Sequence, residues 1–132
     1  MKFFMKDEIV KEWFERAKRD FDTAKLVFKK GEYYDEMVFL LQQSIEKYIK
    51  GYLIFHGWKL KKIHDIEMLL TEAIEFDKSF EEFLDFGRKL TAFYHENRYP
   101  PGSIIEISKN DAKEMLNTSL VMIKKIKNKI NY

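Results

Sequence analysis

Arg88 and His95 are the two residues whose types and spacing best suit chemistry. Seven residues along a helix return to within roughly 20° of the same direction and advance about 10 Å, so both side chains would project from one face. A histidine that titrates near neutrality can move protons, and an arginine can clamp a phosphate and stabilise developing negative charge. The pair therefore suits phosphodiester chemistry without a metal. The alternative is an ordinary solvated face of an amphipathic helix, with Thr91 on the same outward strip.

Glu46 and Lys50 are a second charged pair, one helical turn apart in the favourable order, with Lys47 alongside. The simplest interpretation is a surface ion pair that contributes a few tenths of a kcal/mol. A functional role for the two residues is the alternative.

His64 and Asp65 are similar to the metal-binding dipeptide of phosphohydrolases, but such a site needs further ligands, and the chain has only 3 His and no Cys. We expect Asp65 to cap a helix instead, and His56 to lie at a helix end. The sequence therefore indicates no metal and no cofactor.

Helical periodicity recurs in segments separated by Gly- or Pro-containing turns. These segments cover about residues 7–30, 34–55, 65–74, 77–99 and 108–130. Asp65, Asp77 or Ser79, and Ser108 with Asp111 three residues on, are the expected caps. The pattern predicts an all-α, up-and-down bundle of about five helices, built as a single domain over residues 1–132.

Composition sets limits on partners. The 24 Lys and Arg are nearly balanced by 22 Asp and Glu, which leaves a net charge of +2 and no broad positive field for duplex nucleic acid. No apolar run approaches the roughly 20 residues that span a bilayer, and the charged start does not fit a signal peptide. We therefore expect a cytoplasmic protein without a membrane partner, in which any RNA contact is local.

Three short motifs follow one another along the chain. They are Gln43, Glu46, Lys47 and Lys50 within QSIEKYIK, HDI at residues 64–66, and RYP at residues 98–100. The combination of these three motifs, together with their order and spacing along the chain, resembles the HEPN domain family over roughly residues 7–126. The resemblance implies a helical bundle that pairs as a homodimer and is often encoded beside a minimal nucleotidyltransferase, as a toxin and antitoxin couple.

Members of that family include metal-independent ribonucleases, which carry an Arg, four to six residues, and then a His across the dimer interface. Arg88 and His95 satisfy this spacing. However, Lys89 stands where the nucleases usually have Asn, Asp or His, and no Tyr occupies the second position after His95, where a partner nucleotidyltransferase modifies one. Tyr99 lies four residues on. The chain is thus more similar to the RYP-containing branch, for which nucleotide or partner binding is implied more directly than cleavage.

Three hypotheses follow. In the first, a dimeric module binds a nucleotide, RNA or a cognate nucleotidyltransferase through Arg98 and Tyr99 with Arg88 and His95, supported by Glu46 and Lys50. In the second, His95 is the base and Arg88 the phosphate-stabilising group of a metal-independent endoribonuclease. In the third, the chain is a structural interaction protein without site chemistry. The sequence leaves open whether it is an enzyme.

Overall fold

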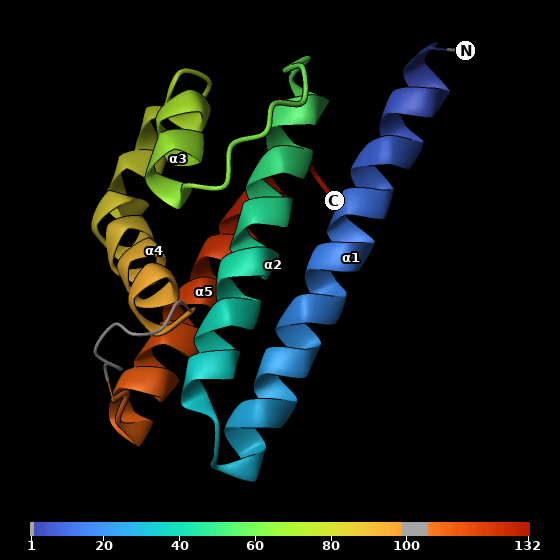
Figure 1. Cartoon of the computed structure of the whole chain (residues 1–132). Coiled ribbons are helices and arrows are strands. Elements are labelled where there is room, and N and C mark those ends of the chain that lie inside the picture. Colours follow the sequence, from blue (N-terminus) through green and yellow to red (C-terminus); the bar gives the residue numbers. More distant parts are fainter. Residues whose placement is uncertain (1, 99–105) are drawn as a thin grey trace.

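The computed structural model describes residues 2–98 and 106–132, with the side chains of residues 7–95 and 106–132. This part is all-α, as predicted (Figure 1). Its elements are α1 (Lys2–Lys30), α2 (Tyr34–Phe55), α3 (Ile66–Ile74), the short 3-10 helix η1 (Lys78–Phe83), α4 (Leu84–Arg98) and α5 (Lys109–Lys129). The four long helices alternate in direction along the chain, which confirms the up-and-down arrangement. None of the described helices is long and apolar enough to cross a bilayer.

α1 and α2 form an antiparallel hairpin. The chain reverses at Gly31, whose φ of 80° lies in the left-handed region that glycine adopts without steric cost. Further along the hairpin, Gly51 of α2 lies against the ring of Phe14, and a Cβ added there would be 2.6 Å from Phe14 Cε1. Gly51 is therefore what allows the two helices to pack this closely.

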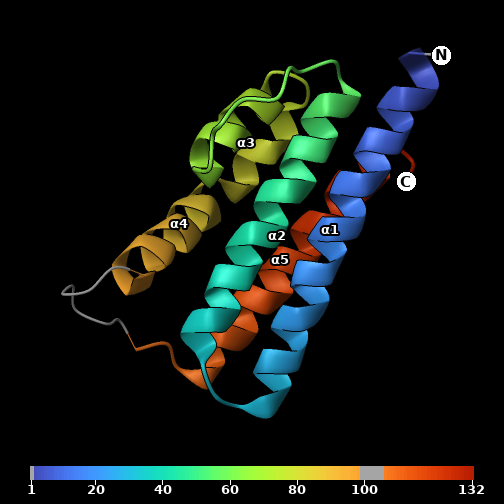
Figure 2. The ribbon, with the colours of Figure 1, turned by 45° about the vertical axis from the view of Figure 1, so that its right-hand side comes forward.

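α2 is the central helix of the bundle. α1 and α5 pack on one side of it, and α3 and α4 on the other (Figures 1 and 2). A helix covered on several sides buries polar as well as apolar residues, and in α2 the buried set includes Gln42, Ser44, Glu46 and Lys50. Ser44 donates a 2.8 Å hydrogen bond to the carbonyl of Ala17 in α1. The face of α2 that carries Glu46 and Lys50, which the sequence analysis assigned to the surface, is thus buried.

Side-chain caps start three of the elements, at predicted positions. Asp65 accepts a 3.1 Å hydrogen bond from the N–H of Met68 at the start of α3, and Ser108 accepts one of 3.0 Å from the N–H of Asp111 at the start of α5. Of the two candidates for the fourth helix, Asp77 is the cap. That helix begins as η1 and continues as α4, which ends at Arg98, close to the predicted end.

Candidate functional site

Glu46 and Lys50 form an ion pair inside the protein. Lys50 Nζ lies 3.0 Å from Glu46 Oε2, and only 4% of the Lys50 side chain and 7% of the Glu46 side chain are exposed. The interpretation as a surface ion pair is therefore wrong, because α2 is the central helix and the pair lies between α1 and the loop before α3. The Lys50 ammonium group also lies 5.9 Å from the centroid of the Trp13 ring, within cation–π range. Lys47 is directed elsewhere, to an ion pair with Asp20 of α1.

His64 joins this pair from the loop before α3. Its Nδ1 lies 3.1 Å from Glu46 Oε2, and its backbone carbonyl accepts a 2.9 Å hydrogen bond from Gln42 Nε2. The imidazole is otherwise open to solvent, with 73% of the side chain exposed. The two residues of the dipeptide therefore have separate roles: Asp65 caps α3, as expected, and His64 contacts α2.

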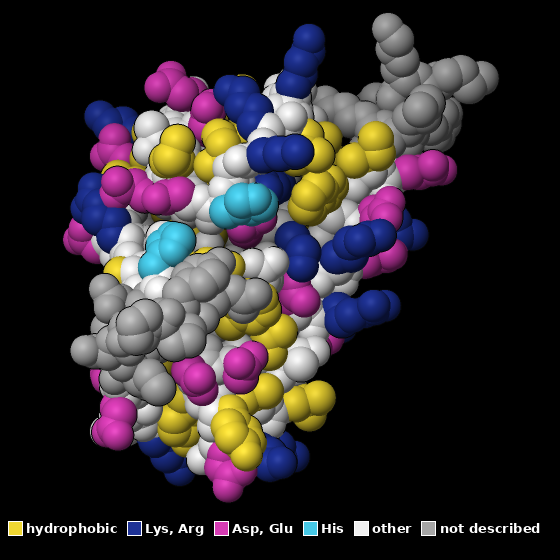
Figure 3. Space-filling model, in the orientation of Figure 1, with side chains coloured by type: hydrophobic (Ala, Val, Ile, Leu, Met, Phe, Trp, Pro, Cys, Tyr) yellow, Lys and Arg dark blue, Asp and Glu magenta, His cyan; other side chains and the backbone are white. Residues whose placement is uncertain are grey.

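A pocket of about 250 Å³ opens next to this network. Its lining residues are Phe39, Gln42, Gln43, Glu46, His64 and Tyr94. The rings of Phe39 and Tyr94 stack at an interplanar angle of 16° with 5.5 Å between centroids, and they connect α2 to α4 at the edge of the pocket. On this side of the molecule, where α3 and α4 lie against α2, Figure 3 shows exposed histidine side chains. The pocket thus combines flat aromatic surface with polar side chains.

Two oxygen atoms in the pocket residues are buried without a hydrogen-bond partner in the described part of the chain: Gln42 Oε1 and Glu46 Oε1. Buried acceptors are normally paired, so each unpaired one calls for an explanation. Both residues line the pocket, so the two acceptors lie next to it. Within residues 7–95 and 106–132, no group of three or more His, Asp or Glu side chains lies close enough together to hold a metal ion.

Arg88 and His95 are both exposed on α4. Arg88 is held by two carboxylates, through an ion pair from Nε to Glu67 of α3 and a 2.9 Å hydrogen bond from Nη1 to Asp85. The His95 ring lies edge-on to Tyr94, with 5.3 Å between centroids, which brings it next to a residue of the pocket. The side chain of Arg98 and all of Tyr99 lie outside the described residues.

Thr91 does not belong to the outward strip of α4, contrary to the sequence interpretation. It is buried, and its Oγ1 accepts a 3.4 Å hydrogen bond from the N–H of Ile66 at the start of α3. The reason is tertiary: α3 packs along this side of α4, so a position that periodicity assigns to solvent is covered by another helix.

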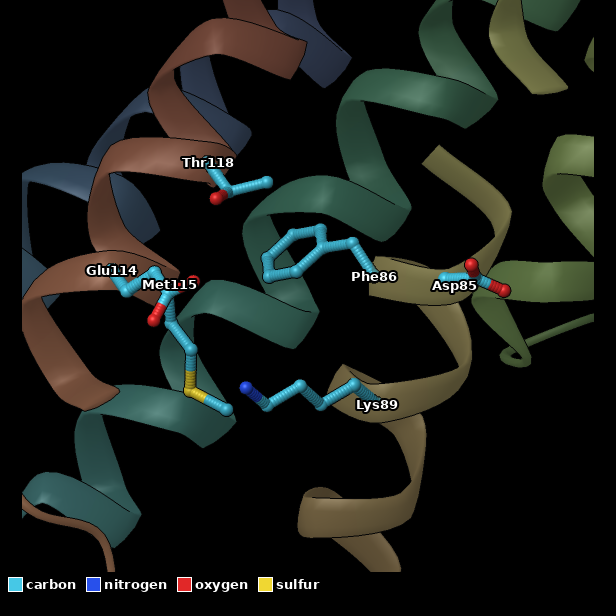
Figure 4. Close-up of a pocket in the computed structure, with 6 residues that line it drawn as sticks. All are labelled: Asp85, Phe86, Lys89, Glu114, Met115 and Thr118. Carbon is cyan, nitrogen blue, oxygen red and sulfur yellow. The ribbon is translucent and has the colours of Figure 1, made fainter. Parts of the chain in front are cut away.

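A second hollow, of about 220 Å³, lies between α4 and α5 (Figure 4). Phe86 and Met115 face each other across it, and the side chain of Lys89 extends from α4 toward α5. Lys89 follows Arg88, the first of the two residues with the spacing that suits phosphodiester chemistry. It points to a different face from the pocket of Gln42 and Glu46, so it adds nothing to that site.

Sequence reasoning named Gln43, Glu46 and Lys50 but missed Gln42, Phe39 and Tyr94. One signal was available, because Gln42, Glu46 and Lys50 follow one another at steps of four and so share a face of α2. The groups opposite that face come from the loop at His64 and from α4, and no local spacing connects them to α2.

Comparison with known proteins places this arrangement in a class. A family model for the HEPN domain matches residues 10–129. The crystal structure of an archaeal HEPN homologue is similar to the chain with a TM-score of 0.72 and 28% sequence identity, over 92% of this chain and 97% of that chain. A comparison with curated proteins gives no match. The fold is thus that of an all-α HEPN homologue, and the chain belongs to the HEPN domain family.

Proposed function

We propose that the chain is a nucleotide- or RNA-linked binding module that acts with a cognate minimal nucleotidyltransferase in a toxin–antitoxin type system. The observation that carries the binding part is the pocket beside the buried ion pair. It offers the flat rings of Phe39 and Tyr94 and the unpaired acceptors of Gln42 and Glu46, which together suit a planar heterocycle with hydrogen-bond donors. Membership of the HEPN family supports the same proposal.

The size of the pocket limits what enters it. Its volume of about 250 Å³ lies below the roughly 300–1,000 Å³ of sites that enclose a drug-sized ligand. A base would therefore enter, while the sugar and phosphate stay outside. The exposed His95 lies beside Tyr94 at this edge, and Arg98 follows three residues later at the end of α4. We assign the phosphate to these two residues, with Tyr99 next in the chain, and a supporting role to Glu46 and Lys50.

The test uses His95→Ala and Arg98→Ala, with Arg16→Ala as the control because Arg16 is an exposed arginine on α1, paired with Glu12. Calorimetric titration with nucleoside monophosphates and pull-down of a co-encoded nucleotidyltransferase should both weaken in the two site variants and stay unchanged in the control. If both readouts are unchanged in His95→Ala and Arg98→Ala, the site assignment fails.

The ribonuclease remains a second candidate because Arg88 and His95 are both exposed on one helix. In that reaction His95 takes the proton of a ribose 2′-hydroxyl, the 2′-oxygen attacks the phosphorus, and the 5′-oxygen leaves with a proton to give a cyclic phosphate end. To contact the phosphate, Arg88 would have to break its ion pairs with Glu67 and Asp85. For this reason we favour the binding module over the ribonuclease. A homodimer could bring both His95 side chains to one groove.

Incubation of the purified protein with structured and unstructured RNA in the presence of a chelator decides between the binding module and the ribonuclease. Cleavage that His95→Ala abolishes would establish the enzyme, whereas no cleavage, or cleavage unaffected by that substitution, would remove it. Light scattering of the same preparation measures whether the chain is a homodimer.

A further inference from the structure

We infer that the pocket of Gln42 and Glu46 recognises a nucleobase by its exocyclic amino group, and so selects adenine, cytosine or guanine over hypoxanthine and uracil. This inference rests on the proposed nucleotide binding and assigns the specificity of the same site. It is carried by two buried acceptor atoms that have no hydrogen-bond partner among the described residues, Gln42 Oε1 and Glu46 Oε1.

The hydrogen-bond network determines that both free atoms are acceptors. The Gln42 amide is oriented by the carbonyl of His64, which can only accept, so the amide nitrogen must face it and the oxygen must face away. Glu46 uses Oε2 for both Lys50 and His64, which leaves Oε1. The side chains of Gln42 and Glu46 lie one turn apart on the same face of α2, and both residues line the pocket.

Burial makes this pair of acceptors selective. Gln42 is 2% exposed and Glu46 is 5% exposed. An amino group brings two N–H donors to such a site, whereas a keto group brings a third oxygen against the two already there. A site built to hydrogen-bond a substrate N–H discriminates strongly against the analogue that lacks it, because the buried acceptors are then left unpaired.

The charge balance favours a neutral ligand over a cation. Glu46 supplies the carboxylate among the described lining residues, and Lys50 at 3.0 Å already compensates its charge, so it offers little to a guanidinium or ammonium group. The rings of Phe39 and Tyr94 lie nearly parallel to each other at the edge of the pocket. A planar heteroaromatic base suits contact with such rings.

The experiment is a calorimetric titration of the full chain with AMP, IMP, CMP and UMP. AMP and IMP differ along one edge of the base: AMP has an amino group beside an unprotonated ring nitrogen, and IMP has a keto group beside a ring N–H. CMP and UMP differ in the same way. We expect AMP to bind about tenfold to a hundredfold more tightly than IMP. CMP should bind more tightly than UMP by a similar factor. Gln42→Leu should reduce the AMP-to-IMP ratio to within about threefold, and Asn117→Leu, which replaces an exposed amide on α5, should leave it unchanged.

The outcomes distinguish a failure of the proposed nucleotide binding from a failure of the amino-group specificity. If no nucleotide binds, the nucleotide-binding part of the proposed function fails, and this inference fails with it. If AMP and IMP bind with equal affinity, if Gln42→Leu retains the preference, or if argininamide displaces AMP, only the amino-group specificity is overturned. Circular dichroism checks that Gln42→Leu is folded, and if it is not, the wild-type comparison of AMP with IMP decides alone.

Discussion

Removing Lys50 from its partner should destabilise this domain far more than removing a lysine from an ion pair on the surface. In Lys50→Met the methionine fills the space of the lysine stem, but the Glu46 carboxylate keeps only His64 as a hydrogen-bond partner. Because only 7% of the Glu46 side chain is exposed, water compensates poorly for the loss of the ammonium group. The substitution therefore leaves a buried carboxylate without its countercharge.

The magnitude follows from the geometry. At the observed 3.0 Å and an effective dielectric constant of ~20, the attraction between the two charges is about 5.5 kcal/mol. Breaking a buried pair by removing one partner costs roughly 3–5 kcal/mol in other proteins, which is close to the attraction calculated for Glu46 and Lys50. For a domain of 132 residues the expected fall in Tm is on the order of 10–20 °C.

Thermal and urea unfolding followed by circular dichroism measure the effect. The matched control is Lys18→Met, since Lys18 pairs with Asp22 at 2.7 Å with the same four-residue separation, but 67% of its side chain is exposed. That substitution should change the free energy of unfolding by less than about 1 kcal/mol. Adding Glu46→Gln to Lys50→Met removes the isolated charge and should recover part of the loss. Equal losses in Lys50→Met and Lys18→Met would refute the reasoning.

Three further predictions concern the bundle. Burial raises the pKa of Tyr48 from 10.0 to about 12, so the stabilising contribution of its neutral form is present below pH 10 and is lost as the pH rises toward 12. Urea unfolding between pH 9 and pH 12 should show a steeper loss in the wild type than in Tyr48→Phe, and parallel curves would contradict this. Gly51→Ala should lower the free energy of unfolding by about 1–3 kcal/mol, because the added Cβ would lie 2.6 Å from Phe14 Cε1. Adding Phe14→Leu should cost less than the sum of the two single variants, and strict additivity would argue against the contact. Ser108→Ala should cost about 1 kcal/mol through loss of the cap on α5, and an unchanged urea midpoint would show that the bond to Asp111 contributes nothing.

The helices could be predicted because their signals are local. The start and end of α2 at Tyr34 and Phe55, the caps at Asp65 and Ser108, and the end of α4 just before Pro100 depend on residues within a turn or two of each boundary. Such signals are complete in the sequence. The 3-10 geometry of η1 was missed, because a cap shows that a helix begins but not how tightly it winds.

The sequence by itself therefore determined the all-α class, the helix boundaries apart from the start of α1, and the family motifs, including the residue types Glu46, Lys50 and His64. α1 begins at Lys2, before the expected start near residue 7. Only the tertiary structure decided that Glu46 and Lys50 are interior, that Thr91 is buried, and that His64 and Tyr94 meet α2 at one pocket. The physical reason is that helical periodicity defines the direction of a side chain relative to its own axis, whereas burial and hydrogen bonding depend on which other helices lie in that direction.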